Sequence, residues 1–253
     1  MCYNIRRVTP RDETSRLRKY PVTVCFCTLA IHAPYRQRAR LLCAAPSVPW
    51  VVLTDEPEDF AHLPVRAIRH IPTGPMAVDY LARLPPTGEG RGAAAYHDKR
   101  FALLAALQDF DTAVFVDADS RISRLPPLGV FPYGLAVLPV VRRSVAKHLE
   151  TWGSWRTPVF VELARHITGA ADILHAAQWC HETLVAVTKD GRESRFFEAW
   201  SVGADFLQSR GVYSGEGGVI GIAAAYAGWS VNYDALTRIA ASIRHEGGGP
   251  KRV

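Results

Sequence analysis

VTVCFCT (residues 22–28) and WVVLT (residues 50–54) are two short apolar runs, and Pro34 lies between them near the start of a helix-like segment at 35–45. Short apolar runs of this kind predict buried strands. Proline near the first turn is typical of a helix start. The order strand, helix, strand predicts a βαβ unit. We therefore expect an α/β fold with a mostly parallel twisted sheet flanked by helices.

The same alternation continues toward the C-terminus. Helices are expected at 98–108 and 219–227, and strands at 112–116, 135–141 and 229–233. Asp190 and Gly191 lie between two further apolar runs, at 184–188 and 195–200. An Asp-Gly pair between two such runs is typical of a tight hairpin turn. We therefore expect a small β-hairpin in the second half of the chain.

Length and composition limit the class of protein. The 253 residues allow one large domain or two small ones. With 48% hydrophobic and 21% charged residues, the chain is not mostly disordered, collagen-like or a coiled coil. We expect a single domain at 21–246, with halves at 21–124 and 125–246. A basic arm is expected at 1–20 and a flexible tail at 247–253.

Charge and cysteine spacing bear on partners and location. The net charge of +6 comes without a basic stripe, so we do not expect a nucleic-acid partner. The five cysteines show no CxxC spacing, which favours reduced, buried thiols. The chain has no 18-residue apolar run and no apolar stretch in its first twenty residues. We therefore expect a cytoplasmic protein without a membrane span or secretory signal, and the oligomeric state stays open.

Two carboxylates follow the expected strand at 112–116, because Asp117-Ala118-Asp119 comes directly after it. In open α/β sheets, ligands bind beyond the carboxyl ends of the strands. Two aspartates spaced in this way can jointly hold a hard cation such as Mg²⁺ or Mn²⁺. The alternative is a pair of solvated turn residues, because aspartate is common in turns.

Three stretches together resemble the GT-A glycosyltransferase superfamily. They are DKRFALL (98–104), DTAVFVDAD (111–119), and the Gly-Glu-Gly turn at 215–217 followed by AGWSVNY (227–233). The resemblance covers about residues 20–246 and is at superfamily level. It implies a GT-A-like, Rossmann-like fold that transfers a sugar from a nucleotide-sugar, such as a UDP-sugar, to an acceptor hydroxyl with Mn²⁺ or Mg²⁺. It places the nucleotide-sugar in the first half and the acceptor in the second.

The resemblance also implies roles for single residues in the donor half. Asp119 and His245 resemble metal ligands, and Asp117 resembles a residue that contacts the metal or the donor ribose. Residues implied in nucleotide-sugar binding are Thr28, Leu29, Ala30, Asp55, Lys99, Arg100, Asp117 and Ala118. Alternatives remain open: His245 as a tail histidine, Asp55 as a cap for the helical segment after Pro57, and Lys99 with Arg100 as a solvated helix face.

The acceptor half departs from the family at one position. Inverting members carry an acidic residue followed by an aspartate that acts as the base, whereas Gly217 follows Glu216 here. Either Glu216 is the base, or the enzyme is a retaining one. A plain helix-start residue is the alternative for Glu216, because a helix N-terminus favours an anion. Residues implied in acceptor binding are Trp179, His181, Glu182 and Gly215, although buried tryptophans are usually part of the core.

Other functions remain as alternatives. A nucleotidyltransferase acting on sugar phosphates shares this sheet topology, but residues 28–32 lack the loop rich in glycine and basic residues that such an enzyme needs after its first strand. A catalytically inactive nucleotide-sugar-binding protein is the second alternative, and Asp117 with Asp119 argues against it. PPTGEGRG (residues 85–92) is a strong loop signal. We expect this loop to be mobile and to close over the bound donor.

Overall fold

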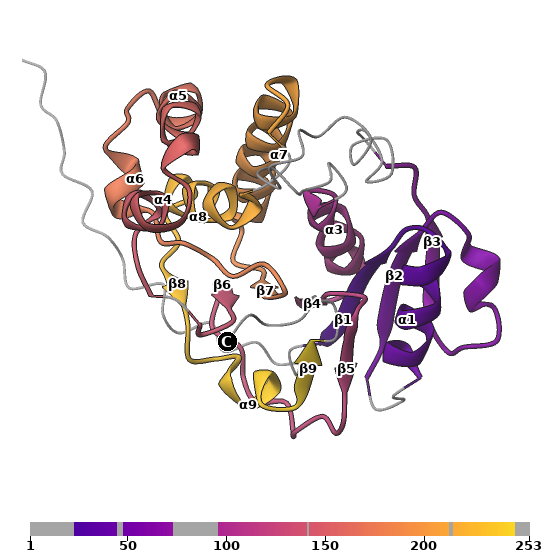
Figure 1. The fold of residues 1–253 in the computed structure, drawn as a ribbon. Coiled ribbons are helices and arrows are strands. Elements are labelled where there is room, and N and C mark those ends of the chain that lie inside the picture. Colours follow the sequence, from indigo (N-terminus) through magenta and orange to yellow (C-terminus); the bar gives the residue numbers. More distant parts are fainter. Residues whose placement is uncertain (1–22, 45–47, 73–95, 141, 213–214, 246–253) are drawn as a thin grey trace, which may run out of the picture.

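The computed structural model of the protein describes residues 23–44, 48–72, 96–140, 142–212 and 215–245. The arm expected at 1–20, the mobile loop expected at 85–92 and the tail expected at 247–253 lie outside these residues. The described part contains a seven-stranded sheet in the order β3-β2-β1-β4-β7-β6-β8 and a two-stranded sheet formed by β5 and β9. The expected α/β class with helices around a mostly parallel sheet is confirmed (Figure 1).

The βαβ unit expected at the start of the chain is present. It consists of β1 (Val24–Ala30), α1 (Ala33–Cys43) and β2 (Trp50–Thr54), with a proline in the first turn of α1. β1 and β2 pair in parallel. A short 3-10 helix (Pro57–Phe60) leads to the edge strand β3 (Arg66–Arg69), which pairs in parallel with β2.

The middle of the sheet is mixed. α3 (Lys99–Asp109) leads into β4 (Thr112–Val116), which lies parallel to β1 as expected. β7 (Leu184–Thr188) is antiparallel to β4 and to β6 (Gly134–Val137). The short strand β8 (Val231–Asn232) pairs in parallel with β6. Among the described strands of this sheet, only β7 runs against the others.

Alternate residues of each strand face two separate cores, as the strand period requires. Cys25 and Cys27 of β1 face the core beneath α3, α4, α5, α7 and α8. Phe26, between them, faces the core beneath α1 and α9. Figure 1 shows the larger group of helices above the sheet and α9 with β5 and β9 below it. Cys43 and Cys180 are also buried and free.

The second half is richer in helices than the sequence indicates. It contains α4 (Val145–Trp152), a 3-10 turn (Ser154–Arg156), α5 (Thr157–Thr168), α6 (Ile173–Ala176), α7 (Glu193–Ser209) and α8 (Glu216–Tyr226). The helix expected at 219–227 corresponds to α8. Gly228, with φ of 73°, follows α8 in the left-handed conformation expected of a residue that ends a helix.

The expected hairpin around Asp190 and Gly191 is wrong. β7 does precede this turn, but residues 195–200 lie within α7 and not in a second strand. The carboxylate of Glu193 accepts hydrogen bonds from the backbone N–H groups of Asp190 and Gly191, at 3.2 and 2.8 Å. An Asp-Gly turn thus starts a helix here. Phe196, Phe197 and Trp200 recur at helical spacing and are buried.

A small two-stranded sheet brings the C-terminal segment back beneath the large sheet. β5 (Ser120–Ile122) follows β4 after the three residues 117–119 and pairs antiparallel with β9 (Ile243–His245), which follows the short helix α9 (Thr237–Ala240). In this register Ser120 is the partner of His245. The pairing therefore places His245 beside Asp119, although the two are far apart in sequence.

The described helices are all too short or too polar to cross a bilayer.

Candidate functional site

The candidate site lies at the sheet edge where the parallel strands β1, β2 and β4 end. Ligands of open α/β sheets bind at this edge. β7 runs the other way and therefore begins here, and the N–H of Asp117 donates to the carbonyl oxygen of Thr183 at 3.1 Å. The first residues of α3 and α8 meet at the same place, with Lys99 Nζ 3.5 Å from Glu216 Oε1. The end of β4 and the starts of α3 and α8 thus place the charged side chains of Asp117, Lys99 and Glu216 together.

Three potential metal ligands converge at the carboxyl end of β4. One ligand atom from each of Asp117, Asp119 and His245 lies within 4.8 Å of the others. His245 Nδ1 is 3.1 Å from Asp119 Oδ1. Burial and the neighbouring charge of Asp117 raise the pKa of Asp119, while His245 opposes that shift. The three residues that the resemblance implies around a metal are therefore grouped as a possible metal-binding set.

Lys99 connects this group to α8. Its Nζ lies 2.9 Å from Asp117 Oδ1 and donates to Glu216 Oε1 at 3.5 Å and to the carbonyl oxygen of Glu182 at 3.4 Å. The Lys99 side chain is only 8% exposed. Burial favours the neutral amine, but the charges of Asp117 and Glu216 outweigh it and raise the pKa of Lys99 well above its usual range. The Lys99 ammonium group thus lies between the carboxylates of Asp117 and Glu216 and holds them together. Lys99 is therefore not part of a solvated helix face.

Glu216 is the first residue of α8 and is buried. Gly215 precedes it with φ of 101°, a conformation that glycine adopts without strain. A Cβ on Gly215 would also lie 2.9 Å from the Phe160 ring. The start of α8 therefore packs closely against Phe160, and the Glu216 side chain points toward Lys99.

The structure explains why glycine follows Glu216. A Cβ on Gly217 would lie 2.1 Å from the carbonyl oxygen of Cys180, and one on Gly221 would lie 2.0 Å from that of Gln178. The Cys180 N–H also donates to the Gly217 carbonyl oxygen at 3.2 Å. α8 therefore packs directly against the 178–180 backbone. An aspartate side chain has no room at position 217.

His181 and Glu182 lie beside this cluster, just before β7 begins at Leu184. Burial, reinforced by the charge of Glu216, raises the pKa of Glu182 to about 8, and Lys99 opposes the shift. His181 Nδ1 is 3.1 Å from Thr183 Oγ1. Burial lowers the pKa of His181, although the charge of Asp117 acts in the opposite direction. Both residues therefore belong to the charged cluster around Lys99.

Trp179 is part of the packing between elements. It is buried, and the His148 ring stacks on it with centroids 3.5 Å apart and an interplanar angle of 3°. Its ring also contacts the first turn of α8, because a Cβ on Gly217 or Gly218 would lie about 3 Å from it. With His148 on one face of the ring, Trp179 supports α8 and does not form an open stacking platform.

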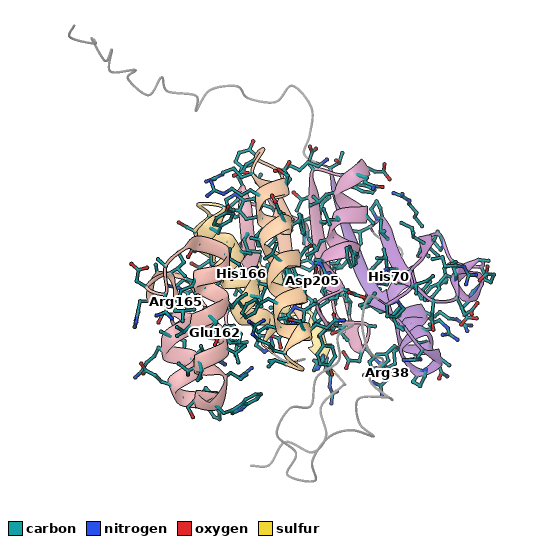
Figure 2. All side chains as sticks on the ribbon, turned by 90° about the horizontal axis from the view of Figure 1, so that it is seen from above. Arg38, His70, Glu162, Arg165, His166 and Asp205 are labelled. Carbon is teal, nitrogen blue, oxygen red and sulfur yellow. The ribbon has the colours of Figure 1, made fainter. Side chains whose placement is uncertain are left out.

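Two arginines near the site have no signal in the sequence. Arg38, on α1 and labelled in Figure 2, places Nη1 4.0 Å from Asp119 Oδ2. Arg156 is buried, and a Cβ on Gly215 would lie 3.1 Å from its Nη1. Burial lowers the pKa of Arg156, against the opposing charges of Glu216 and Glu182. Arg156 is thus a second cation beside the start of α8, of which Glu216 is the first residue.

The β1 residues implied in nucleotide-sugar binding lie mostly inside the fold. Thr28 and Ala30 are fully buried, and Leu29 is partly buried against the core. The Thr28 Oγ1 atom has no hydrogen-bond partner among the described residues. Ala118 is buried in the lower core. Thr28, Ala30 and Ala118 are therefore packed inside the fold next to the edge of the sheet where the candidate site lies.

Asp55, at the end of β2, closes the turn between β1 and α1. Its carboxylate accepts from the His32 N–H at 3.1 Å and from Arg36 Nη1 at 2.8 Å. His32 has φ of 73°, so this hydrogen bond holds an unusual backbone conformation. Burial raises the pKa of Asp55, but the hydrogen bonds from His32 and Arg36 outweigh it, and the net shift is downward. Asp55 therefore binds residues at the start of α1. No described side chain caps the 3-10 helix after Pro57, so the cap expected there is wrong.

Arg100 points away from this cluster. Its Nε donates to Ser201 Oγ on α7 at 3.1 Å, and its Nη1 donates to the His97 carbonyl oxygen at 2.7 Å. Nη2 lies 4.0 Å from Asp205, a residue of α7 labelled in Figure 2. Arg100 is buried and connects α3 to α7. The solvated-face alternative is therefore wrong for Arg100 as well.

No protein-family model matches this sequence, and no curated protein matches it.

Proposed function

We propose that this protein is a metal-dependent glycosyltransferase of the GT-A type, which transfers a sugar from a nucleotide-sugar to an acceptor hydroxyl. The observation that carries the proposal is the group Asp117, Asp119 and His245 at the carboxyl end of β4, joined through Lys99 to Glu216. Asp117 Oδ1 and Glu216 Oε1 both lie within 3.5 Å of the same Lys99 nitrogen. The candidate metal ligand Asp117 and the candidate acceptor-activating carboxylate of Glu216 thus lie beside the same lysine nitrogen.

The donor set fits a divalent metal ion. Carboxylate oxygens suit Mg²⁺ and Mn²⁺, and an imidazole is a common ligand for transition metals. Asp117, Asp119 and His245 would hold the ion, and their ligand atoms lie within 4.8 Å of one another. When bound, Mn²⁺ or Mg²⁺ would stabilise the negative charge of the leaving diphosphate as a Lewis acid. The sheet edge provides the position where ligands of α/β folds bind.

The side chains around the ion have separate tasks. Lys99 holds Asp117 and Glu216 in fixed positions and keeps a positive charge near the leaving group, where it stabilises developing negative charge. Glu216 accepts the proton of the acceptor hydroxyl as general base, which requires the hydroxyl within about 3 Å. Glu216 is buried at the start of α8, so its carboxylate is held without competing contacts from bulk water.

The acceptor approaches from the α4–α5 side of Glu216. Arg156 lies on that side, beside Gly215. Trp155, the residue before it, is half exposed, and the Arg156 guanidinium lies 5.7 Å from its ring centroid. An exposed indole beside a buried cation suits the apolar face and hydroxyl groups of a sugar ring. Trp155, in place of the packed Trp179, is therefore the stacking residue that we propose for the acceptor.

The test is a ligand-binding panel. Thermal unfolding is measured with UDP-, GDP-, CMP- and dTDP-sugars, each with and without Mn²⁺. A ligand that binds only the folded state raises the apparent stability by mass action. We expect one nucleotide-sugar to raise the melting temperature only when Mn²⁺ is present, and slow hydrolysis of that donor without acceptor. Stabilisation without any donor turnover would identify the inactive binding protein instead. No stabilisation by any donor would contradict the proposal.

A further inference from the structure

Arg156 is a buried cation that is not paired with an acid. It ends the 3-10 turn before α5, and the residue is only 9% exposed. Its side chain forms no hydrogen bond or ion pair with any of the described residues, and its Nε atom is buried without a partner. Burying a charge without a partner costs free energy. Arg156 therefore retains hydrogen-bond donors for a partner that the described chain does not supply.

Two glycines make room for this guanidinium. A Cβ on Gly153 would lie 2.4 Å from Arg156 Nη2 and 2.6 Å from Nε, and a Cβ on Gly215 would lie 3.1 Å from Nη1. All three distances are shorter than an ordinary van der Waals contact, so a larger residue at either position would push the arginine aside. Gly153 ends α4, and Gly215 precedes the first residue of α8. The guanidinium is thus held between these two helices, beside the start of α8.

Two carboxyl groups act on Arg156 without pairing with it. Burial lowers the pKa of Arg156, and the charges of Glu216 and Glu182 oppose that shift. The Glu216 carboxylate accepts its hydrogen bond from Lys99, at 3.5 Å. Burial, with the charge of Glu216, raises the pKa of Glu182 to about 8, so that group is mostly uncharged at neutral pH. Arg156 is therefore near the proposed base, but its donors are not used by either carboxyl group.

Further basic side chains lie near Arg156. Burial, followed by the charges of Arg156, Arg143 and His181, lowers the pKa of His148 to about 4. The His148 ring stacks on Trp179, and its Nδ1 atom is buried without a hydrogen-bond partner. The carbonyl oxygen of Arg143 accepts from the Trp179 N–H at 2.9 Å, so the Arg143 backbone lies beside the same residue. Among the described residues, neither Arg143 nor Arg156 forms an ion pair.

We propose that Arg156, with Arg143 and His148 near it, forms an anion subsite that binds a phosphate or carboxylate group of the acceptor. The proposal rests on the proposed function, because it gives the class of molecule whose hydroxyl group Glu216 activates. A guanidinium can donate two parallel N–H groups to such an oxyanion, and these hydrogen bonds are charge-assisted and strong. The acceptor is therefore an acidic or a phosphorylated molecule.

The position of this subsite suits a small acceptor. Arg156 Nη1 lies beside Gly215, and Glu216 is the next residue. Consecutive Cα atoms are about 3.8 Å apart, so one sugar-sized molecule can place an anionic group at Arg156 and a hydroxyl group at Glu216. The ring of half-exposed Trp155 has its centroid 5.7 Å from the Arg156 guanidinium. A sugar ring with an acidic substituent matches this combination of an indole, a cation and a carboxylate.

The first test is calorimetric titration of the full chain in metal-free buffer. Inorganic phosphate and acetate are the two probes, titrated separately, and the anion that binds more tightly identifies the group that the acceptor carries. We expect saturable binding of at least one of them. R156Q should weaken that binding by about 10–100-fold, as expected when hydrogen bonds to a charged group are lost. Binding of neither anion, or unchanged binding by folded R156Q, would overturn the proposal.

R143Q keeps the proposal testable if R156Q does not fold, because Arg143 is only partly buried. It should weaken anion binding in the same direction as R156Q, and far-UV circular dichroism shows whether each variant is folded. Unchanged anion affinity in R143Q, together with an unfolded R156Q, would assign Arg156 a structural role only and overturn the proposal.

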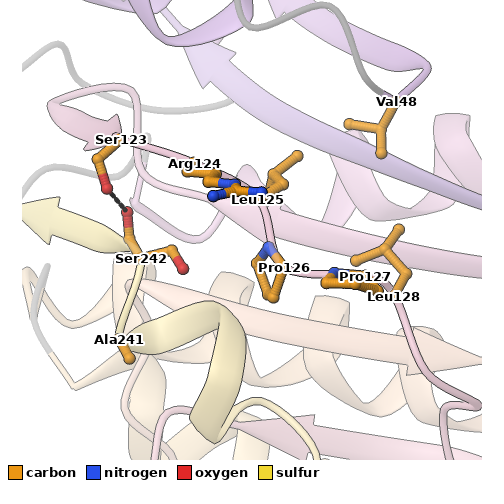
Figure 3. Close-up of a pocket in the computed structure, with 9 residues that line it drawn as sticks. All are labelled: Val48, Ser123, Arg124, Leu125, Pro126, Pro127, Leu128, Ala241 and Ser242. Atoms are coloured by element: carbon orange, nitrogen blue, oxygen red, sulfur yellow. Dashed lines mark hydrogen bonds between the residues drawn. The ribbon is translucent and has the colours of Figure 1, made fainter.

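Arg124 supplies the matched control. Figure 3 shows it on the wall of a cavity of about 670 Å³ beneath the small sheet, and none of Arg143, His148 and Arg156 lines that cavity. Arg124 is exposed. Salt screens exposed charges that lie further away than the Debye length, so R124Q should change the anion affinity by less than about twofold. Equal weakening by R124Q and R156Q would indicate a general attraction of anions to arginines and would overturn the proposal.

The second test separates the acceptor side from the donor side. The titration with the better-bound anion is repeated with Mg²⁺ and a saturating amount of the nucleotide-sugar found in the donor panel. An anion on the acceptor side binds together with the donor, so its affinity should not fall. Displacement of the anion by the donor would place it in the donor site and overturn the proposal.

The two proposals fail in different ways. Stabilisation by a nucleotide-sugar with no anion binding at Arg156 would overturn the anion subsite and leave the proposed function intact. Anion binding that R156Q abolishes, with no stabilisation by any nucleotide-sugar, would instead contradict the proposed function and overturn the acceptor role of the subsite with it.

Discussion

Lys99 Nζ lies 2.9 Å from Asp117 Oδ1, and this contact joins the start of α3 to the end of β4. The same nitrogen lies 3.5 Å from Glu216 Oε1 at the start of α8. All three side chains are less than a fifth exposed. Two carboxylates that would otherwise repel each other are therefore held beside one buried cation.

Replacing Lys99 by methionine should destabilise the fold strongly. Methionine keeps the length of the side chain but removes the ammonium, and it leaves Asp117 and Glu216 in a largely buried place without their cation. Removing one partner of a buried ion pair costs about 3–5 kcal/mol. Urea unfolding at neutral pH measures the change in the free energy of unfolding.

Lys147 supplies the control for this substitution. It forms an exposed ion pair with Glu150 one helical turn away, with its side chain 67% exposed. Lys147→Met should change the free energy of unfolding by less than about 1 kcal/mol, because exposed pairs contribute little. Similar changes in the free energy of unfolding for the two substitutions would contradict the role of Lys99 in holding Asp117 and Glu216 together.

Asp119→Asn should abolish stabilisation by Mn²⁺. The amide keeps the size of the carboxylate but removes its charge, beside His245 at 3.1 Å and within the group that includes Asp117. With the ion at 100 times its dissociation constant, binding to the folded state adds about 2.7 kcal/mol of stability. Thermal unfolding with and without Mn²⁺ is the measurement, and Asp172→Asn, at an exposed position on another face, is the control. Unchanged stabilisation of the Asp119 variant would remove Asp119 from the ligand set.

Much of the fold could be predicted because its strands are short, apolar and separated by one helix. The strands β2 and β4 coincide with the apolar runs at 50–54 and 112–116. α7 was missed because Asp-Gly chemistry serves a hairpin and a helix start equally well. Only the contact of Glu193 with the 190–191 backbone decides between them. α4 and α5 were missed although the sequence carries a signal for them, because the buried residues Val145 and Leu149 in α4, and Phe160, Leu163 and Ala164 in α5, recur at helical spacing.

The sequence predicts which types of residue form the candidate site, but it does not predict which way their side chains point. Lys99 and Arg100 are neighbours in the sequence, yet successive residues of a helix point about 100° apart. Lys99 therefore faces Asp117, while Arg100 faces Ser201 on α7. Arg156 enters the site from a 3-10 turn, a short element that carries almost no sequence signal. Tertiary packing determines where these side chains point.

His97 should make the fold less stable as the pH falls. Burial is the main reason that its pKa is lowered from 6.5 to about 4, and Glu216 and Asp98 oppose that shift while Arg100 supports it. The unfolded chain takes up a proton as the pH falls through 6.5, but the folded chain does so only near pH 4. Stability contributed by the neutral ring is thus present above pH 6.5 and is lost between these values.

The loss attributable to His97 should reach about 3 kcal/mol over this range. His97→Leu should remove that share of the pH dependence while keeping a buried side chain of similar size. Urea unfolding from pH 7.5 to 4.5, taken as the difference between the two proteins, isolates it from the carboxylates. A constant difference across this range would show that His97 is not a buried neutral ring.

Gly217→Ala should destabilise the protein by about 3 kcal/mol or more. Its Cβ would lie 2.1 Å from the Cys180 carbonyl oxygen, a backbone atom that cannot swing aside. Overpacking of this kind forces backbone shifts. Gly129→Ala is the control, because no heavy atom lies within 4 Å of a Cβ at that position. Thermal unfolding compares the two, and equal melting temperatures would show that α8 can move away from residues 178–180.

Glu216→Gln should separate the chemical step from donor binding. The amide keeps the shape of the side chain at the start of α8 but cannot accept the proton of an acceptor hydroxyl. Glu182→Gln, in the turn before β7, is the matched control. Burial, with the charge of Glu216, raises the pKa of Glu182 to about 8. The Glu182 carboxyl group is therefore mostly protonated at neutral pH, and an amide reproduces its charge.

With the donor found in the nucleotide-sugar panel, Glu216→Gln should leave donor affinity unchanged and lower turnover by about 10²–10⁴-fold. Glu182→Gln should change turnover by less than about tenfold at pH 7. A raised acceptor KM with turnover near that of the unchanged protein would show that Glu216 orients the acceptor without removing its proton. If turnover and KM are both unchanged, Glu216 is only a residue at the start of a helix that is paired with Lys99. The step would then follow a retaining course, in which no base is needed at the start of α8.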